Sequence, residues 1–268
     1  MGLNGKIIIE GLGLHSGKAC RLTIEPCDTR EILMCSGENE LPLRKLKTNG
    51  TNRGSDYIFP DGTKLRTCEH VLSAITGMGI YSGIRLTVEG GEMPAIDGCA
   101  RALCEELTKH LYSLEDAKEL PTIEVRKPVI VYGNDNTRFI AAFPSDRLHI
   151  TYTVEYEYVG TQIYDYAHDE GKYVSDIAGA RTFAMRREVE YLRSNGMALG
   201  GSLDNAIVIG EKIEAKGGLR WGDEFVRHKV LDLMGDIASL GRPLRAHIIA
   251  VRAGHELHLK LTEKLKGE

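Results

Sequence analysis

Alternating hydrophobic and polar positions predict short strands in both halves of the chain, separated by stretches with a helical period. The expected strands cover residues 6–10, 19–25, 31–35 and 84–88 in the first half, and 122–131, 137–143, 148–156, 206–210 and 246–251 in the second. The expected helices begin near residue 68, with Thr67 as N-cap, and near residue 97, cover 183–194 and about 223–240, and close the chain. Because strands cluster ahead of helices, the pattern predicts an α+β fold rather than a doubly wound parallel sheet.

One clear break in this pattern lies in the segment SLEDAKELPTIEV, residues 113–125. A helical pattern up to about Tyr112 gives way to charged residues and Pro121, and then to a β-rich run. We therefore predict two domains, residues 1–119 and 120–268. Each half holds a helix–glycine–strand unit whose helix has a histidine near its start, which is compatible with a duplication and also with coincidence between two amphipathic helices.

Composition narrows the class of protein. A chain of 268 residues can bury a substantial core, and a net charge of −4 gives no electrostatic reason to expect nucleic acid as a partner. No apolar run approaches the roughly 18 residues of a spanning helix, and the first residues lack the apolar core of a signal peptide. The six cysteines form no C-x-x-C pair and are expected to be reduced thiols. We therefore expect a cytoplasmic protein without a membrane span.

Two glycine-rich segments, GLGLHSG at 11–17 and GMGIYSG at 77–83, invite comparison with nucleotide-binding loops. Both miss the spacing of the dinucleotide fingerprint by one place, and neither is followed immediately by a helix. The sequence also lacks a G-x-x-x-x-G-K-[ST] loop. We interpret both segments as turns that need positive φ angles.

The most informative segment is DEFVRHKVLDLMGDIASLG, residues 223–241. His228, Asp232 and Asp236 recur at every fourth position and form one stripe along the expected helix. The apolar residues gather on the other side of the helix: Val226, Val230, Leu233, Ile237 and Leu240. The stripe is therefore expected to face solvent or a cleft. A histidine and a carboxylate one turn apart can chelate a divalent metal such as Zn²⁺, and the alternative is a solvated polar face.

A metal held by this stripe needs a further ligand from elsewhere in the chain. His70 is a candidate because it lies near a helix N-terminus and follows Glu69, and an acid beside a metal ligand can act as general base on water. In the segment RAGHELHLK, His255 could serve as an acid or oxyanion partner and Arg252 as a phosphate clamp. Taken singly, each of these residues is more often an ordinary surface residue.

Together and in order, these motifs resemble the UDP-3-O-acyl-N-acetylglucosamine deacetylases, the metal-dependent amidases that commit Gram-negative bacteria to lipid A synthesis. The resemblance runs from end to end of the chain and rests on several long motifs. The matching segments are GLGLHSG at 11–17, RTCEHVLSAITGMGI at 66–80, EMPAIDGCA at 92–100, ARTFAMRREVEYLRSNGMALGGSLDNAIVI at 180–209, GLRWGDEFVRHKVLDLMGD at 218–236 and AGHELHLKL at 253–261.

The resemblance implies a zinc site and a general base. His70, His228 and Asp232 would be the metal ligands, with one position left open for water. Glu69 would be the base. The stripe assigned to a cleft from its spacing alone therefore carries two of the three implied ligands.

The resemblance also implies roles for the residues around the metal. His255 would be the protonated partner that stabilises the oxyanion or protonates the leaving amine, and Asp236 would set its charge and orientation. Thr182 of the ARTF motif would help to hold the oxyanion. Lys229 would supply positive charge near the substrate.

Architecture and reaction follow from the same resemblance. The fold would be two similar α+β domains, each a small, mainly antiparallel sheet with helices, and the helices would be sandwiched between the two sheets, with the active site where the domains meet. The reaction would be zinc-dependent hydrolysis of the N-acetyl group of a UDP-linked 3-O-acylated glucosamine, with release of acetate. Fe²⁺ is an alternative metal in the cell. A monomer is expected, with transient membrane-surface contact through the acyl chain of the substrate.

The substrate also needs places for its acyl chain and its diphosphate. The family uses a hydrophobic passage built by an insert in the second domain, which falls here within 183–210, and the candidates are Met185, Leu192 and Leu199. Arg252 is the candidate for the diphosphate. The apolar residues are equally compatible with an ordinary core.

Two departures from the family pattern and two other functions stay open at this stage. Cys68 stands where the family commonly has valine, and its thiol would lie two residues from a metal ligand. His258 stands where the family commonly has asparagine, and a second histidine near His255 could shift its pKa. The alternative functions are a metal amidohydrolase for another acylated amino sugar and a non-catalytic, zinc-stabilised binding protein.

Overall fold

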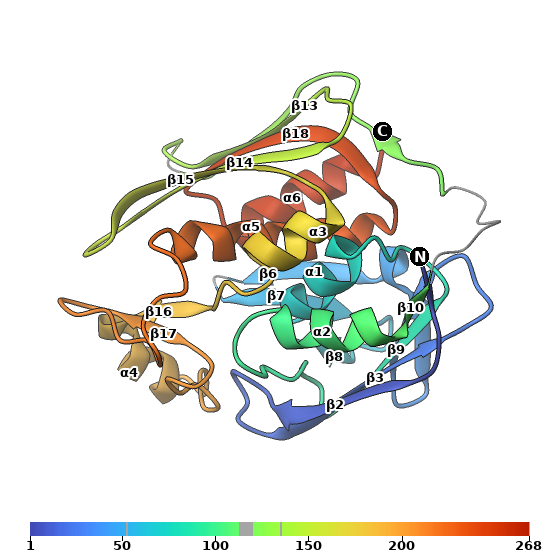
Figure 1. Ribbon diagram of the computed structural model, residues 1–268, viewed down its shortest axis with the longest axis horizontal. Coiled ribbons are helices and arrows are strands. Elements are labelled where there is room, and N and C mark those ends of the chain that lie inside the picture. The colour runs from blue at the N-terminus through green and yellow to red at the C-terminus, as the bar shows by residue number, and fades with distance from the viewer. Residues whose placement is uncertain (52, 113–119, 135, 268) are drawn as a thin grey trace.

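The computed structural model of the chain describes residues 1–51, 53–112, 120–134 and 136–267, and Figure 1 shows its layers. Two sheets form the outer layers, and helices lie between them. The main helices of this inner layer are α1 (Glu69–Gly77), α2 (Arg101–His110), α5 (Glu224–Ile237) and α6 (His255–Leu265). The expected α+β fold with helices sandwiched between two sheets is confirmed.

The sheet of the first half has five strands in the order β2-β3-β9-β4-β5. These strands are β2 (Ile7–Leu12), β3 (Ala19–Pro26), β9 (Ile84–Glu89), β4 (Ile32–Ser36) and β5 (Asn39–Pro42). β4 and β9 run parallel, and the other neighbours run antiparallel. Along β9, Ile84, Leu86 and Val88 are buried against the helices, whereas the residues between them are not buried.

The sheet of the second half follows the order β12-β13-β18-β14-β15, with β11 paired to β18 outside this path. Its strands are β11 (Ile123–Glu124), β12 (Val129–Tyr132), β13 (Phe139–Phe143), β14 (Leu148–Tyr156), β15 (Gly160–Ala167) and β18 (Leu244–Val251). β14 and β18 run parallel in the middle of this sheet. Its inner side chains, such as Ile150 and Ile248, are fully buried.

The two sheets share one topology. With β11 left aside and the strands of each sheet counted along the chain, both have the order first, second, fifth, third, fourth, and the parallel pair is the fifth with the third. In both halves one helix precedes the central fifth strand and another follows it. This repeated order supports the duplication that the sequence left open.

Each half also carries an additional unit between its fourth strand and the helix before its fifth. In the first half this unit is the sheet of β6 (Lys47–Thr51), β7 (Gly54–Ile58) and β8 (Lys64–Leu65). In the second half it consists of α3 (Glu170–Lys172), β16 (Phe183–Met185), α4 (Arg186–Ser194) and β17 (Ile207–Ile209). β16, β17 and α4 stand to one side of the layers, at the lower left of Figure 1.

The remaining elements are short. β1 (Gly2–Leu3) pairs antiparallel with β10 (Leu111–Tyr112). Two 3₁₀ segments cover Leu43–Lys45 and Ala238–Leu240, and a π-helical turn covers Tyr173–Ile177. In the part of the chain that the structure describes, no helix has the length and apolar character needed to cross a membrane.

The prediction that Thr67 caps α1 is wrong. Thr67 has a left-handed φ of 54°, and its hydroxyl donates to Glu92 at 3.0 Å. Cys68 occupies the N-cap position, and its side chain makes no capping hydrogen bond.

Several predicted boundaries also differ from the structure. α2 begins at Arg101 rather than near residue 97, because Asp97 accepts a hydrogen bond from Arg220 at 2.9 Å and lies in the preceding turn. Residues 183–185 form a strand rather than the start of a helix, because they pair with β17. The expected strand 122–131 is divided into β11 and β12. The predicted domain boundary at residue 119 lies outside the described residues and stays a prediction.

Helix α1 of the first half packs directly against α5 of the second half. A Cβ atom on Gly235 would lie 1.9 Å from the backbone oxygen of Glu69, so only glycine fits at this position of α5. Apolar residues of α1, α5 and both sheets belong to one continuous core. Within α5, every residue except Arg227 is buried. The glycine therefore sets how near the first turn of α1 comes to the middle of α5.

Substitution Gly235→Ala is expected to destabilise the protein, although alanine is normally the better helix residue. The added methyl group would meet backbone atoms rather than a flexible side chain, so the helices must separate, at a cost of about 2 kcal/mol or more. Urea unfolding of the variant measures this loss. Gly222→Ala is the matched control, because a Cβ there meets nothing within 4 Å. Equal stability of both variants would contradict the packing argument.

Candidate active site

Two helices, one from each half, bring three potential metal ligands together. His70 is the second residue of α1, and His228 and Asp232 lie one turn apart on α5. The Nε2 atoms of His70 and His228 are 3.6 Å and 3.2 Å from Oδ1 of Asp232. The ligand atoms of the three residues all lie within 4.8 Å of one another, and all three side chains are buried.

The chemistry of this donor set fits a divalent metal. Oδ1 of Asp232 is buried and has no hydrogen-bond partner within the described residues, which is costly for a carboxylate oxygen unless a cation satisfies it. Nδ1 of His228 is 3.0 Å from the carbonyl oxygen of Ala180, so it carries the proton and leaves the lone pair of Nε2 facing the cluster. Two imidazole nitrogens and one carboxylate suit Zn²⁺ with an open fourth position.

Burial keeps the imidazole of His228 neutral, which is the form that binds metals. It lowers the pKa of His228 to about 4, against the opposing effect of the Asp232 carboxylate. Lys229 neutralises the same carboxylate from the other side, with Nζ 2.5 Å from Oδ2. Burial alone would lower the pKa of Lys229, but Asp232 outweighs it and the pKa is raised, so the side chain stays charged.

Glu69 is the first residue of α1, and its buried carboxylate lies near the candidate metal ligand Asp232. The backbone N–H of Ser55 donates to its Oε2 at 3.0 Å. Gly54 leaves room for the other oxygen, because a Cβ there would lie 2.9 Å from Oε1. Burial raises the pKa of Glu69, and nearby His255 and His70 only partly oppose this. A carboxylate with a raised pKa is a stronger base, as general-base catalysis requires.

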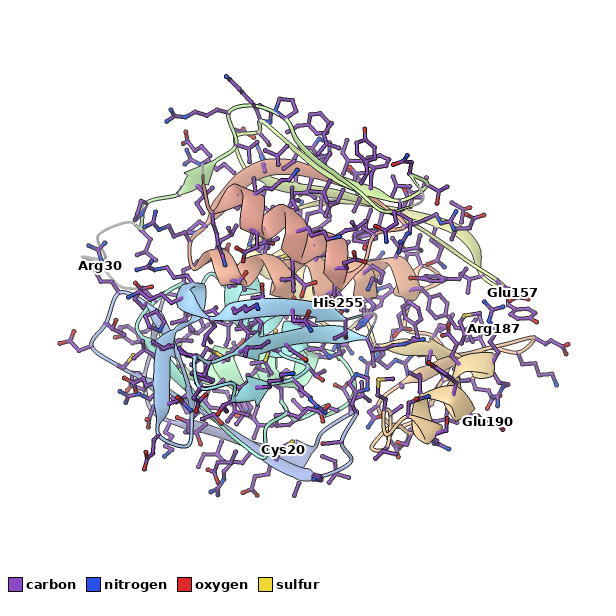
Figure 2. All side chains as sticks on the ribbon, turned by 180° about the vertical axis from the view of Figure 1, so that it is seen from behind. Cys20, Arg30, Glu157, Arg187, Glu190 and His255 are labelled. Atoms are coloured by element: carbon purple, nitrogen blue, oxygen red, sulfur yellow. The ribbon has the colours of Figure 1, made fainter. Side chains whose placement is uncertain are left out.

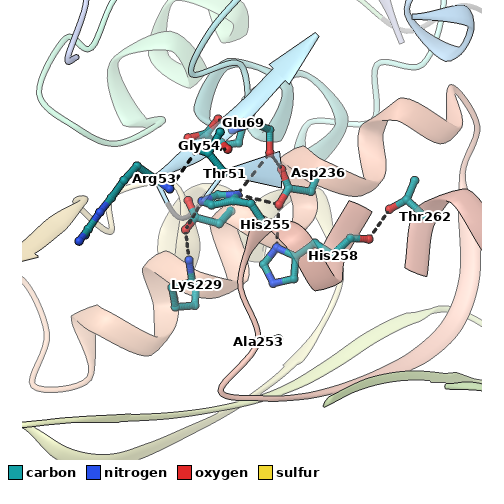
Figure 3. Close-up of polar contacts among 12 residues, drawn as sticks. Thr51, Arg53, Gly54, Glu69, Lys229, Asp236, Ala253, His255, His258 and Thr262 are labelled. Carbon is teal, nitrogen blue, oxygen red and sulfur yellow. Dashed lines mark hydrogen bonds and ion pairs between the residues drawn. The ribbon is translucent and has the colours of Figure 1, made fainter. Parts of the chain in front are cut away.

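His255, the first residue of α6, is held as an acid by a buried carboxylate. Its Nδ1 donates to Oδ2 of Asp236 at 2.8 Å, as Figure 3 shows, and its Nε2 lies 3.6 Å from Oδ2 of Asp232. Burial lowers the pKa of His255, but Asp236 outweighs this and raises it to about 9. The imidazole is therefore protonated at neutral pH, and its Nε2–H faces the cleft.

Asp236 is fully buried and is surrounded by hydrogen-bond donors. Ser55 donates its hydroxyl to Oδ1, and Nδ1 of His258 lies 2.7 Å from Oδ2, the oxygen that also accepts from His255. These contacts overcome burial and lower the pKa of Asp236 to about 2. On its far side, Nε2 of His258 is 2.8 Å from the hydroxyl of Tyr152. Asp236 is therefore an ionised anchor for two histidines.

One cleft of about 520 Å³ is lined by the three potential metal ligands and by Glu69, Lys229 and His255. Thr182, Met185, Leu192 and Arg252 also line it. Leu199 does not line the cleft and is 55% exposed, and its backbone N–H donates to His15 in the GLGLHSG turn. Of the four residues that the sequence suggested for the acyl chain and the diphosphate, three therefore line this cleft and Leu199 does not.

The alternative of a solvated polar face on α5 is wrong. His228, Asp232 and Asp236 are each no more than 2% exposed, because α1 and α6 cover this side of the helix. His228 and Asp232 face the cleft, and Asp236 reaches it only through His255.

Cys68 does not reach the cleft. It is fully buried, its thiol lies 3.6 Å from the carbonyl oxygen of Leu65, and burial holds its pKa well above the usual value. The six cysteines are all free thiols, as expected.

Sequence reasoning missed the polar residues that connect α4 to the two halves. Arg53, next to β7, pairs with Glu188 of α4 at 2.8 Å, and Arg187 of α4 pairs with Glu157 in the turn between β14 and β15. Figure 2 shows Arg187 and Glu157 beside each other at the edge of the molecule. All four line the cleft. Their charges carry no sequence signal, because each partner is far away along the chain.

Comparison with known proteins gives a family match over nearly the whole chain. Residues 1–267 match the sequence model of the family described as LpxC, UDP-3-O-acyl N-acetylglycosamine deacetylase. The chain belongs to this family.

Relatives named UDP-3-O-acyl-N-acetylglucosamine deacetylase cover nearly the full length of this family member. That of Oleidesulfovibrio alaskensis is 40% identical over 265 residues, which cover 92% of this chain and 82% of the relative. That of Campylobacter hominis is 36% identical, covering 96% and 88%, and that of Syntrophotalea carbinolica is 33% identical, covering 98% and 86%. The match includes both helices that meet at the cleft, so this deacetylase family is recognised over the whole site and not over one half alone.

In this member of the family, His258→Ala is expected to lower stability by about 2 kcal/mol, because Asp236 loses a charge-assisted hydrogen bond in a buried place. Urea unfolding measures the change. His110→Ala is the matched control, since the imidazole of His110 lies near the surface and its Nδ1 contacts the backbone oxygen of Asn4 and not a buried carboxylate. If the two variants unfold at the same urea concentration, His258 does not support Asp236.

Proposed function

We propose that the protein is a zinc-dependent deacetylase that hydrolyses the N-acetyl group of UDP-3-O-acyl-N-acetylglucosamine and releases acetate, the committed step of lipid A biosynthesis. The observation that carries this proposal is the buried Oδ1 of Asp232, which has no hydrogen-bond partner among the described residues. It lies 3.6 Å and 3.2 Å from the imidazoles of His70 and His228, and the buried carboxylate of Glu69 is nearby. A cation at that oxygen and a base next to it are the two requirements of metal-assisted amide hydrolysis. Family membership supports the deacetylase chemistry.

His70, His228 and Asp232 would hold the metal. When bound, Zn²⁺ supplies Lewis-acid chemistry, since it polarises a carbonyl group and lowers the pKa of water toward about 7. Fe²⁺ accepts the same nitrogen and oxygen ligands and is the alternative in the cell.

Glu69 is the proposed general base. Its buried carboxylate takes the proton from the water molecule that attacks the acetamide carbonyl. The hydrogen bond from the backbone of Ser55 fixes Oε2, so the carboxylate keeps its orientation while Oε1 faces Gly54. The raised pKa of Glu69 suits it for accepting this proton.

Two buried, positively charged side chains near Asp232 are proposed to stabilise the negative charge that develops on the carbonyl oxygen. The protonated Nε2–H of His255 and the ammonium group of Lys229 are buried donors whose charge is retained by Asp236 and Asp232. Thr182 is proposed to contribute a further contact to this oxygen. Asp236 positions His255, which then protonates the amine as it leaves.

The cleft also supports a place for the 3-O-acyl chain. Met185 and Leu192 line it and are largely buried, whereas Leu199 lies outside it. We therefore propose that Met185 and Leu192, rather than Leu199, line the acyl passage. Arg252 lies at the cleft 3.3 Å from Glu155 and is proposed to turn to the diphosphate.

A single chain in the cytoplasm is the proposed working form. The cytoplasm is proposed because the substrate is a UDP-linked sugar. The amidohydrolase with another acylated sugar remains the nearest alternative, and a panel of acylated amino sugars separates the two.

Glu69→Gln is expected to lower kcat by about 10²-fold or more, because the amide cannot accept the proton, whereas the zinc content stays near that of the unaltered protein. Acetate release from the UDP-acyl-sugar and metal analysis provide the two readouts. Glu190→Gln is the control, since Glu190 is exposed on α4, away from His255 in Figure 2. Near-native turnover of Glu69→Gln would remove Glu69 as the base.

Metal removal separates an enzyme from a metal-stabilised binding protein. Chelation is expected to abolish acetate release while the circular dichroism spectrum is retained, because the core of both halves is continuous without the metal site. His228→Ala should behave like the chelated protein. Unfolding on chelation together with no activity of the zinc-loaded form would favour the binding protein.

The acyl passage predicts that a substrate without its 3-O-acyl chain has a kcat/KM at least about tenfold lower, since each buried methylene contributes about 0.8 kcal/mol. Leu192→Ala is expected to reduce the advantage of the acylated substrate, and Leu199→Ala, outside the cleft, to leave it unchanged. Equal kcat/KM for the two substrates would refute the passage.

A further inference from the structure

A second cluster of metal-ligating side chains lies on the outer face of the second sheet. β14 and β18 run parallel with His149 directly beside His247, and Asp165 of β15 lies opposite Thr151 of β14. These residues alternate with fully buried Ile150 and Ile248, so their side chains point away from the helices. None of them lines the cleft described above.

Hydrogen bonds direct both imidazoles to one place. Nε2 of His149 lies 2.9 Å from Oδ1 of Asp165, and the hydroxyl of Thr151 donates to the same oxygen at 2.7 Å. Because that hydroxyl proton is committed to Asp165, Nε2–H of His247 donates to Oγ1 of Thr151 at 2.9 Å. The two imidazole rings are stacked, with centroids 4.1 Å apart and planes 8° from parallel.

We propose that His149, His247 and Asp165 form a second site for a divalent transition metal, separate from the catalytic centre. Their ligand atoms already lie within 4.8 Å of one another. Ligands at about 2.0–2.1 Å from a tetrahedral zinc are about 3.4 Å apart, so small side-chain rotations on three neighbouring strands complete the site. On metal binding, the hydrogen bond between His247 and Thr151 breaks, and a water molecule takes the fourth coordination position.

Protonation states favour this site at neutral pH. Burial and the neighbouring His149 lower the pKa of His247, which keeps its imidazole neutral. The hydrogen bond from Thr151 lowers the pKa of Asp165, which keeps it ionised. Neutral imidazole and carboxylate are the forms that bind, and two nitrogens with one oxygen select Zn²⁺, Ni²⁺ or Cu²⁺ over Mg²⁺ or Ca²⁺.

The test titrates Zn²⁺ into protein whose catalytic site is already loaded with one equivalent, using calorimetry and metal analysis after dialysis. The unaltered protein is expected to take up one further equivalent, and His247→Ala to take up none. His110→Ala, which changes a histidine elsewhere on the surface, should bind like the unaltered protein. His228→Ala should lose the catalytic equivalent and keep the outer one.

Two results would overturn the second site. One is no further uptake by the loaded, unaltered protein. The other is an extra equivalent that persists in His247→Ala, which would place that metal elsewhere, including in the catalytic cleft. Because His247 is outside the catalytic machinery, acetate release by His247→Ala is expected to stay within about twofold, so failure of this proposal leaves the proposed function untouched.

Discussion

The backbone contact between α1 and α5 is the constraint on which the site depends. Gly235 lets the carbonyl group of Glu69 approach α5 more closely than any side chain would allow. That approach places the first turn of α1 over the middle of α5, where Asp232 lies one turn before Asp236. The distance of 3.6 Å between His70 and Asp232 follows from this packing, because neither residue shares an element with the other. Stability and ligand geometry are therefore set by the same contact.

Three buried carboxylates lie close together here, and their surroundings give them different properties. Asp236 accepts three hydrogen bonds and stays ionised, so it can hold His255 as a cation. Asp232 has Lys229 on one oxygen and no donor among the described residues on the other, which leaves that oxygen for a metal. Glu69 accepts a hydrogen bond from the backbone N–H of Ser55, and burial raises its pKa, whereas the pKa values of Asp232 and Asp236 are lowered. Hydrogen bonding and burial, and not residue type, thus give the three carboxylates their different properties.

Local patterns predicted the helices and the stripe on α5 well, because the spacing of His228, Asp232 and Asp236 is a property of one helix. Contacts between distant segments were beyond such patterns. Ser55 and Tyr152 bond to Asp236 and His258 from strands whose alternation signals only burial. Thr67 has the residue type of an N-cap, yet its φ angle and its bond to Glu92 are set by tertiary structure. The strand at 183–185 likewise depends on pairing with β17, more than twenty residues later in the chain.

Because the strand order is repeated, the two histidines of the candidate metal site come from corresponding helices of the two halves. His70 and His228 each lie near the start of the helix that precedes the central strand of its own sheet, so they occupy corresponding places in the two repeats. Four residues later the correspondence ends, because α1 has Ala74 where α5 has Asp232. The first repeat therefore contributes one imidazole and no carboxylate at that turn, whereas the second contributes one imidazole and one carboxylate. Neither repeat alone holds the candidate ligand set, which is complete only where α1 and α5 meet.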